Sequence, residues 1–302
     1  MTAPSQAFTA NQVPQLAGKT ALVTGANTGL GFETAKVLAQ RDATVYVACR
    51  SPEKAEAAIE AILEETPFAS VHFVALDLGN LESVRAAAAS LAELPSLDLL
   101  INNAGIMTPP FSLTEDGFES QFGVNHLGPF AFTGLLLDKL VNTSGARIVN
   151  TSSLAARRGN ILFDDPHAEQ GYDAMVRYSM SKLANLMFAV ELDRRLKLAG
   201  AQCISVACHP GVADTELSRY FPRWFMLAQP VLKRLFNTPA QGAWPTLQAA
   251  TDAGVEGGDY FGPTRAMQTS GPSRKVGYKE MDQVALTRLW RISEELTGVK
   301  YF

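Results

Sequence analysis

Tyr178 and Lys182 are the side chains in this sequence best suited to move a proton at an oxygen atom. They stand four residues apart in the segment YSMSK, and positions i and i+4 of a helix lie on one face. A phenol has an ordinary pKa of about 10, and a nearby ammonium stabilises the phenolate and lowers that pKa. The spacing therefore predicts a tyrosine acid/base with a lysine beside it, although each residue taken alone would usually be packed or solvated.

A glycine-rich run, TGANTGLG, follows an apolar stretch at 20–23 and precedes a helical pattern at 30–41. Glycines allow a tight turn and the close approach of a pyrophosphate, whose charge is stabilised by free N–H groups at a helix N-terminus. The spacing is G-x-x-x-G-x-G rather than G-x-G-x-x-G, so the glycines could also merely turn the chain. The strand–turn–helix context favours dinucleotide binding by Gly25, Asn27, Thr28, Gly29, Leu30 and Gly31.

Arg50 ends the second apolar run, where a protein that binds NAD typically places Asp or Glu against the ribose 2′-OH. An arginine there can form charge-assisted hydrogen bonds to a 2′-phosphate, which an acidic side chain would repel. The alternative is a solvated surface arginine. The sequence favours NADP(H) over NAD(H).

Composition and charge exclude several classes of protein. Of the 302 residues 47% are hydrophobic and 19% charged, which predicts a globular core. A net charge of −4 lacks the excess of positive charge that is typical of proteins that bind nucleic acid. The three cysteines and four histidines lack metal-ligand spacing, so we expect no metal site and a reducing cytoplasmic location. Residues 1–15 lack the parts of a secretory signal, and the apolar run at 130–137 is too short to span a membrane.

Short apolar runs alternate with amphipathic stretches along most of the chain. The runs lie at 20–23, 44–48, 71–75, 97–102, 147–153 and 203–208, and the clearest helical patterns lie at 30–41, 52–65 and 81–92. Apolar strands separated by crossover helices predict an α/β fold with one doubly wound parallel sheet of Rossmann type and helices on both faces. We expect a flexible N-terminal arm at 1–16 and a single Rossmann-type domain at 17–302, with an insertion at about 218–237.

The motifs together resemble the short-chain dehydrogenase/reductase family over about residues 18–263. The resemblance rests on TGANTGLG, NNAG at 102–105 and YSMSK, supported by HPGVADT at 209–215. Within the family the chain is most similar to the retinol-dehydrogenase-like branch, through VACR, VNHLGPF, IVNTSSLAA and YSMSKLANLMF. The resemblance implies a nicotinamide-dependent interconversion of an alcohol and a carbonyl.

The resemblance also implies residue roles. Asp77 and Leu78 would flank the adenine, and Asn103 and Ala104 would line a ribose. The cofactor site would further include Gly105, Pro210, Gly211, Val212, Thr215, Tyr178 and Lys182, with Thr215 near the carboxamide or the phosphates.

Catalysis would use four side chains. Ser153, rather than Ser152, would hold and polarise the substrate oxygen, and Tyr178 would exchange the proton. Asn125 would stand at a helical irregularity where a backbone carbonyl and a water link Lys182 to solvent. Ser153 and Tyr178 are 25 residues apart, longer than the compact family pattern. A cofactor-binding regulatory or scaffold protein with little turnover is the alternative to an enzyme, because fold alone cannot separate the two.

The segment at 219–236 combines aromatic and aliphatic residues with arginines and a lysine. Its place after the sixth strand suits an apolar lid over a small apolar alcohol or carbonyl substrate. Packing or contact in a homo-oligomer, and weak contact with a membrane surface, are the other interpretations. The sequence chooses neither a particular substrate nor a reaction direction.

Overall fold

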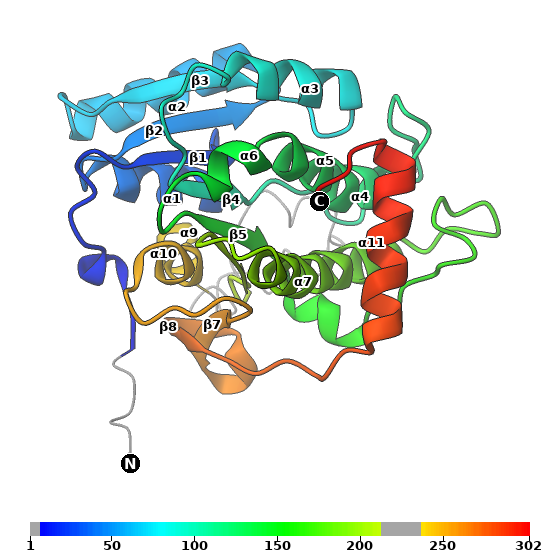
Figure 1. Cartoon of the computed structure of the whole chain (residues 1–302). Coiled ribbons are helices and arrows are strands. Elements are labelled where there is room, and N and C mark those ends of the chain that lie inside the picture. The colour runs from blue at the N-terminus through cyan, green and yellow to red at the C-terminus, as the bar shows by residue number, and fades with distance from the viewer. Residues whose placement is uncertain (1–6, 213–236) are drawn as a thin grey trace.

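The computed structural model describes residues 7–212 and 237–302 (Figure 1). An eight-stranded sheet has the order β3-β2-β1-β4-β5-β6-β7-β8, and all pairs are parallel except β7 with β8. The strands are β1 Thr20–Thr24, β2 Thr44–Cys49, β3 Val71–Ala75, β4 Leu99–Asn102, β5 Arg147–Thr151, β6 Ile204–Cys208, β7 Tyr260–Arg265 and β8 Ser270–Lys275. The predicted α/β fold of Rossmann type is confirmed.

Helices cover both faces of the sheet. They are α1 Gly29–Ala39, α2 Pro52–Glu65, α3 Leu81–Ser90, α4 Ser120–Phe122, α5 Gly128–Leu135, α6 Leu137–Val141, α7 Ala174–Leu198, α9 Pro239–Gly242, α10 Trp244–Thr251 and α11 Gln283–Thr297. Short 3₁₀ turns at Ala10–Gln12 and Leu154–Arg158 and a π-helical turn at Gly123–Leu127 complete the elements that matter below. Among the described residues, no helix is both long enough and apolar enough to cross a membrane.

Alternating strand residues separate two cores. Val23 and Val47 pack with Leu38 of α1 on one face, whereas Leu22 and Leu100 pack with the α3, α5 and α7 side of the sheet. This alternation is what a strand buried on both faces requires, because successive side chains point to opposite sides. The order of the strands reverses between β1 and β4, which is where an open α/β sheet forms its ligand crevice.

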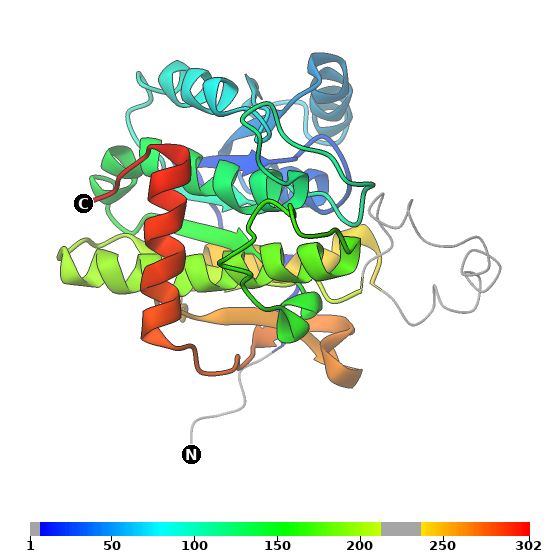
Figure 2. The same ribbon diagram turned by 90° about the vertical axis from the view of Figure 1, so that its right-hand side faces the viewer.

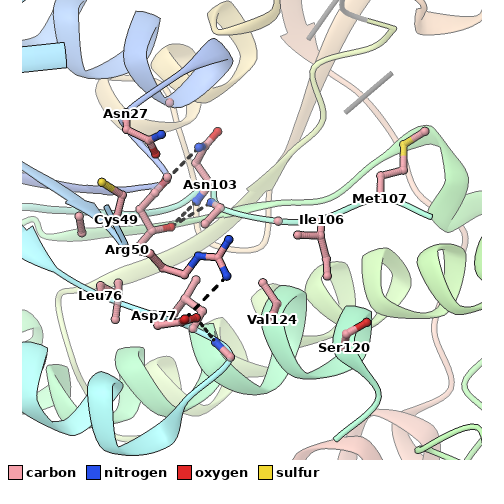
Figure 3. A pocket seen from close by; sticks show the side chains of 18 of the residues that line it. Asn27, Cys49, Arg50, Leu76, Asp77, Asn103, Ile106, Met107, Ser120 and Val124 are labelled. Atoms are coloured by element: carbon pink, nitrogen blue, oxygen red, sulfur yellow. Dashed lines mark hydrogen bonds and ion pairs between the residues drawn. The ribbon is translucent and has the colours of Figure 1, made fainter. Parts of the chain in front are cut away.

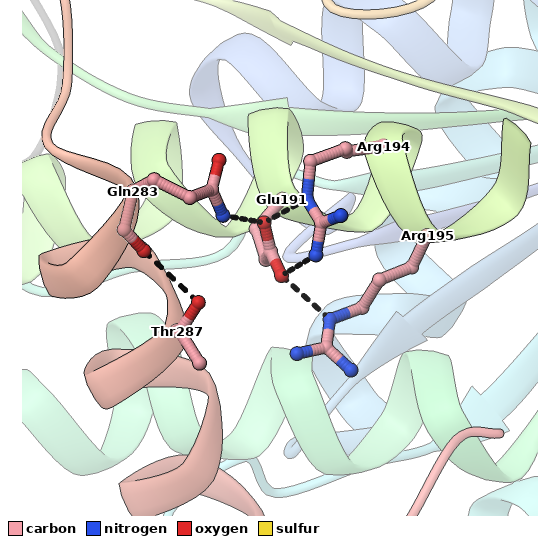
Figure 4. A network of polar contacts seen from close by, with 5 residues as sticks. All are labelled: Glu191, Arg194, Arg195, Gln283 and Thr287. Atoms are coloured by element: carbon pink, nitrogen blue, oxygen red, sulfur yellow. Dashed lines mark hydrogen bonds and ion pairs between the residues drawn. The ribbon is translucent and has the colours of Figure 1, made fainter. Parts of the chain in front are cut away.

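The C-terminal helix α11 crosses α7 and α5 (Figure 2). The buried Glu191 carboxylate of α7 accepts hydrogen bonds from Arg194 and Arg195 on its own helix, and from Gln283 at the start of α11 (Figure 4). The guanidinium of Arg195 also lies 4.2 Å from the ring centre of Trp290 on α11. These contacts fasten α11 to the helix that carries Tyr178 and Lys182.

The flexible arm predicted for residues 1–16 is wrong for the part that the structure describes. Phe8 exchanges two 2.8 Å backbone hydrogen bonds with Ser273 of β8 and is buried, as are Val13 and Leu16. The physical reason is that three apolar side chains spaced through a polar segment find a core, and the backbone pairs with the free edge of the sheet.

The strands β7 and β8 were not predicted. Their sequences, YFGPTR and SGPSRK, contain glycine and proline, which normally argue against a strand. Both lie at the end of the sheet, where a proline interrupts fewer backbone pairs.

Candidate active site

The glycine turn between β1 and α1 is closely packed. Gly25 adopts φ +66° and donates a 2.7 Å hydrogen bond to the Ala48 carbonyl of β2. A Cβ on Gly31 would lie 2.4 Å from the Gly25 carbonyl oxygen and 2.5 Å from Asn103 Nδ2. Thr28 precedes α1 without a capping hydrogen bond from its side chain. The turn therefore brings bare backbone and an uncapped helix N-terminus to a surface that an anion can approach.

A cavity of about 570 Å³ opens at this turn, at the carboxyl ends of β1, β2, β3 and β4 (Figure 3). All twelve residues predicted for this part of the nucleotide site line it: Gly25, Asn27, Thr28, Gly29, Leu30, Gly31, Arg50, Asp77, Leu78, Asn103, Ala104 and Gly105. The glycine cradle and the polar rim fit a dinucleotide cofactor. The sequence alone missed lining residues such as Thr24, Cys49, Ile106, Met107 and Val124.

Thr24, the last residue of β1, holds the cavity-lining residues Asn103 and Ala104 by hydrogen bonds. Its hydroxyl oxygen accepts 3.0 Å hydrogen bonds from the backbone N–H groups of Asn103 and Ala104. The side-chain Nδ2 of Asn103 also donates a 2.8 Å hydrogen bond to the Thr24 carbonyl. The signal in the sequence was a hydroxyl directly before the glycine turn, on the strand next to NNAG.

Arg50 follows β2 on the rim of the cavity and faces Asp77 beyond β3 (Figure 3). Arg50 Nη1 lies 3.7 Å from Asp77 Oδ2, and the arginine side chain is 73% exposed. The other carboxylate oxygen of Asp77 accepts a 2.8 Å bond from the Gly79 N–H. An ion pair this exposed is weak, so the guanidinium can turn to a phosphate without a large loss.

Gly105 separates the cavity from Lys182 and Asn125. A Cβ on Gly105 would lie 3.0 Å from Asn125 Oδ1 and 3.1 Å from Lys182 Nζ. The absence of a side chain thus brings the cofactor cavity next to the two polar groups predicted for proton transfer.

Asp173 caps the start of α7 by accepting hydrogen bonds from Met175 and Val176 N–H groups, which fixes the turn that precedes Tyr178. Tyr178 is buried and hydrogen-bonded to Ser153. Lys182 Nζ lies 6.0 Å from the Tyr178 ring centre and donates a 3.2 Å bond to the Thr151 carbonyl. The structure therefore brings Ser153, Tyr178 and Lys182 together at the end of β5.

The sequence predicted a lowered pKa for Tyr178, and the environment of the phenol raises that pKa instead. Burial raises the pKa of the phenol above 10, and the hydrogen bond from Ser153 opposes that rise only in part. Burial also lowers the pKa of Lys182 from 10.5 to about 8, because the ammonium loses its hydration. The lysine is still mostly protonated at neutral pH, but it loses its proton at a lower pH than an exposed lysine does.

The two serines after β5 differ in their surroundings. Ser152 is buried and its hydroxyl donates a 2.7 Å bond to the Lys182 carbonyl, so it fixes α7 against the sheet. Ser153 begins the Leu154–Arg158 turn, accepts a 3.2 Å bond from the Ala155 N–H and contacts Tyr178. Of the two, Ser153 is the one placed beside the phenol.

Asn125 lies in the π-helical turn Gly123–Leu127, which provides an irregularity of the kind that the resemblance implied. Its amide nitrogen donates 2.9 Å bonds to the Ile106 carbonyl and to Ser181 Oγ. Its Oδ1 accepts a 2.7 Å bond from the Ile106 N–H. The side chain is fully buried, so these bonds fix the segment that follows Gly105.

The loop after β6 is only partly described. Gly211 has φ +74° and donates a 3.2 Å bond to Nδ1 of the buried His209, whose Nε2 lies 2.9 Å from Gln268 Oε1. Burial lowers the pKa of His209 to about 4, so the imidazole is neutral near pH 7 and holds Gly211 and Gln268 by hydrogen bonds. Pro210, Gly211 and Val212 do not line the 570 Å³ cavity. Thr215 and the segment 219–236 lie outside the described residues.

Comparison with known proteins gives one consistent result. A family model described as short chain dehydrogenase matches residues 19–224. Mouse retinol dehydrogenase 11 is 44% identical over 294 residues, covering 94% of this chain and 88% of that protein. Human retinol dehydrogenase 12 is 41% identical over 290 residues, covering 95% and 89%.

Solved structures agree with these sequence relatives. An uncharacterized protein from Mycobacterium paratuberculosis superposes with a TM-score of 0.82 at 38% identity, covering 98% of this chain and all of that one. A candidate NAD(P)-dependent gluconate 5-dehydrogenase from Beutenbergia cavernae, solved with NADP at low occupancy, has a TM-score of 0.64 at 25% identity. That match covers 79% of this chain and 92% of the other.

Proposed function

The chain belongs to the short-chain dehydrogenase family, in its retinol-dehydrogenase-like branch, and we propose that it is an NADP(H)-dependent enzyme that interconverts an apolar alcohol and its carbonyl. Family membership makes it an oxidoreductase that uses a nicotinamide cofactor. The observation that carries the finer proposal is the cluster of half-buried Ser153 with buried Tyr178 and Lys182, which meets the glycine-lined cavity where Lys182 lies against Gly105.

The preference for NADP(H) is supported by the charge at the end of β2. Arg50 lines the cavity, and its own strand ends in Ala48 and Cys49 without a carboxylate. The nearest acid given by the structure is Asp77, which follows β3 and pairs with the arginine at 3.7 Å. A 2′-phosphate is doubly charged and would compete well for the guanidinium.

When bound, the cofactor supplies or accepts the hydride at carbon, so the work of the protein is confined to the oxygen. We infer that the Ser153 hydroxyl, which lies beside the phenol, donates a hydrogen bond to that oxygen and that the Tyr178 phenol gives or takes its proton. A phenol whose pKa is raised stays protonated at neutral pH and suits the donor role in carbonyl reduction. In alcohol oxidation the same group must first lose its proton, so that direction should gain from high pH.

Lys182 is the next group along the proton path. Its Nζ contacts the Thr151 carbonyl at 3.2 Å, and both this Nζ and Asn125 Oδ1 lie close to Gly105. With a pKa of about 8 the lysine can change protonation near neutral pH. We infer that it returns a proton to Tyr178 and that the π-helical turn at Asn125 connects it to solvent.

The substrate class is supported by two observations. The sequence relatives are named as retinol dehydrogenases, and retinol is an apolar alcohol. Beyond Gly105 the cavity wall is continued by Ile106, Met107 and Pro109, which offer apolar contacts. We therefore infer a hydrophobic aldehyde, ketone or alcohol as the substrate.

A steady-state screen tests the proposal and separates it from the alternative of a cofactor-binding protein with little turnover. Purified protein is mixed with NADPH or NADH and a panel of aldehydes, including retinal, and nicotinamide absorbance is followed. The expected result is NADPH oxidation with apolar aldehydes. Binding of NADPH without oxidation by any member of the panel, or in the reverse direction with alcohols, would favour the regulatory alternative.

A further inference from the structure

The loop that continues from Gly105 is held in a conformation that its sequence does not favour. Thr108 adopts φ +49°, which places a β-branched residue in the left-handed region. Its neighbours Ile106, Met107 and Pro109 line the cavity, and Figure 3 shows Ile106 and Met107 along this loop. Such backbone persists only where surrounding contacts fix it, and it is frequent in segments that clamp ligands.

Two buried amides, four residues apart, supply these contacts. Asn125 bonds both the N–H and the carbonyl of Ile106, and Gln121 Oε1 accepts a 2.9 Å bond from the Thr108 N–H. Both side chains are completely buried. Gln121 therefore meets the loop at its strained residue, while Asn125 meets it two residues earlier.

The other end of Gln121 reaches the start of the helix that carries Tyr178. Its Nε2 donates to the Ala174 carbonyl at 2.9 Å and to the Tyr172 hydroxyl at 3.1 Å. The Tyr172 hydroxyl in turn donates a 2.7 Å bond to the Pro109 carbonyl. One amide thus connects the loop, the segment before α7 and the first residue of α7.

Apolar side chains surround this connection and remain partly open. The ring of Tyr172 contacts Phe111 with centres 5.4 Å apart, and Phe111 is 50% exposed. Met175 is 47% exposed and stands three residues before Tyr178, on the same face of α7. These residues give the loop an apolar surface at the approach to the catalytic tyrosine.

We propose that Gln121 is a positioning residue for substrate specificity, which sets the loop 106–109 and Tyr172 as an apolar wall for long-chain carbonyl substrates. The proposal rests on the proposed function and adds the residue that controls which carbonyls are bound. Gln121 does not line the cavity itself, so it acts through the loop and through Tyr172. A short aldehyde does not reach this wall, whereas a long aliphatic one does.

The test compares propanal with decanal in Gln121→Ala, Tyr172→Phe and the unaltered enzyme. Loss of the hydrogen bond to the strained loop should raise KM for decanal by about tenfold and KM for propanal by less than about twofold. Tyr172→Phe keeps the ring and should show the same split with a smaller rise. Gln248→Ala is the matched control, because Gln248 is a buried amide on α10 that bonds Asp252. The affinity for NADPH, measured by fluorescence titration, should change far less than KM for decanal in all variants.

Two outcomes would overturn the positioning role. One is an equal change of KM for both aldehydes in Gln121→Ala, and the other is a chain-length split of the same size in Gln248→Ala. If the unaltered protein binds NADPH but reduces no aldehyde, the proposed function fails. Hydrogen exchange can then still show whether Gln121 holds the loop 106–109. Residues 106–112 should then exchange faster in Gln121→Ala than in the unaltered protein or in Gln248→Ala. Unchanged exchange would reject the role of Gln121 in positioning the loop.

Discussion

Burying Lys182 costs the fold free energy that a neutral side chain of similar size would not cost. Its pKa falls from 10.5 to about 8 on burial, and its ammonium has a 3.2 Å bond to the Thr151 carbonyl. A folded pKa below the unfolded one means that the unfolded chain binds more protons between pH 8 and pH 10.5. The penalty is therefore fully present below pH 8 and disappears as the pH rises toward 10.5.

The size of this penalty follows from the two pKa values. At pH 7 the protonated lysine destabilises the folded state by about 3 kcal/mol, and at pH 9.5 by about 1 kcal/mol. Lys182→Met removes the charge and keeps the length of the side chain, but it loses a hydrogen bond worth about 1 kcal/mol. The variant should be more stable than the unaltered protein by about 2 kcal/mol at pH 7 and nearly equal at pH 9.5.

Urea unfolding without cofactor at both pH values measures this difference, since a bound cofactor would add its own stabilisation. Raised pKa values at buried Cys203 and Tyr178 also change stability above pH 9, but these contributions cancel between the variant and the unaltered protein. Cys208 does not cancel in this way, because the ammonium of Lys182 lowers the pKa of its thiol and the variant loses that effect. Lys279→Met, at an exposed position after β8, is the control and should show no pH-dependent difference. A stability difference for Lys182→Met that is the same at pH 7 and pH 9.5 would refute the lowered pKa.

Three further changes test the site. Tyr178→Phe removes the exchangeable proton but keeps the ring, so turnover should fall by at least about a hundredfold, with NADPH affinity within twofold by titration; near-normal kcat would exclude the acid/base role. Arg50→Ala should lower the ratio of kcat/KM for NADPH over NADH by about tenfold; equal losses with both cofactors would indicate a folding defect. Gly31→Ala places a methyl 2.4 Å from the Gly25 carbonyl and should lower the unfolding free energy by about 1–3 kcal/mol and weaken NADPH binding; unchanged affinity would show that the turn can relax.

The first six strands could be predicted because each is a short apolar run, and the first three are followed by clear helical patterns. The prediction of 71–75 matches β3, and 52–65 matches α2, where Ser51 caps the helix and Pro52 begins it. Strand ends were less certain, since β5 stops at Thr151 and leaves both serines outside the ladder. Edge elements such as β7, β8 and the segment around Phe8 depend on pairing between distant parts of the chain, which local patterns do not encode.

The chemistry of the site was partly predictable from residue types and partly set by burial. Spacing placed Tyr178 and Lys182 on one face of α7, and the structure keeps them there. The direction of the Tyr178 pKa was predicted wrongly, because the sequence shows that a lysine is near but not that both groups lose their water. Gln121 gave no signal, since a glutamine acquires a role only through the three segments that fold around it.

Asn125 joins the two parts of the site in a way that affects how its replacement should be interpreted. Its amide bonds Ser181, next to Lys182, and it also bonds both backbone groups of Ile106 in the apolar wall. Removing the side chain therefore releases the substrate loop as well as any proton path through the π-helical turn. A lower rate in an Asn125 variant does not by itself identify a proton relay. Under our proposal the wall held by Gln121 and Asn125 contacts only long aldehydes, so the part of the loss that is the same for short and long aldehydes belongs to proton transfer.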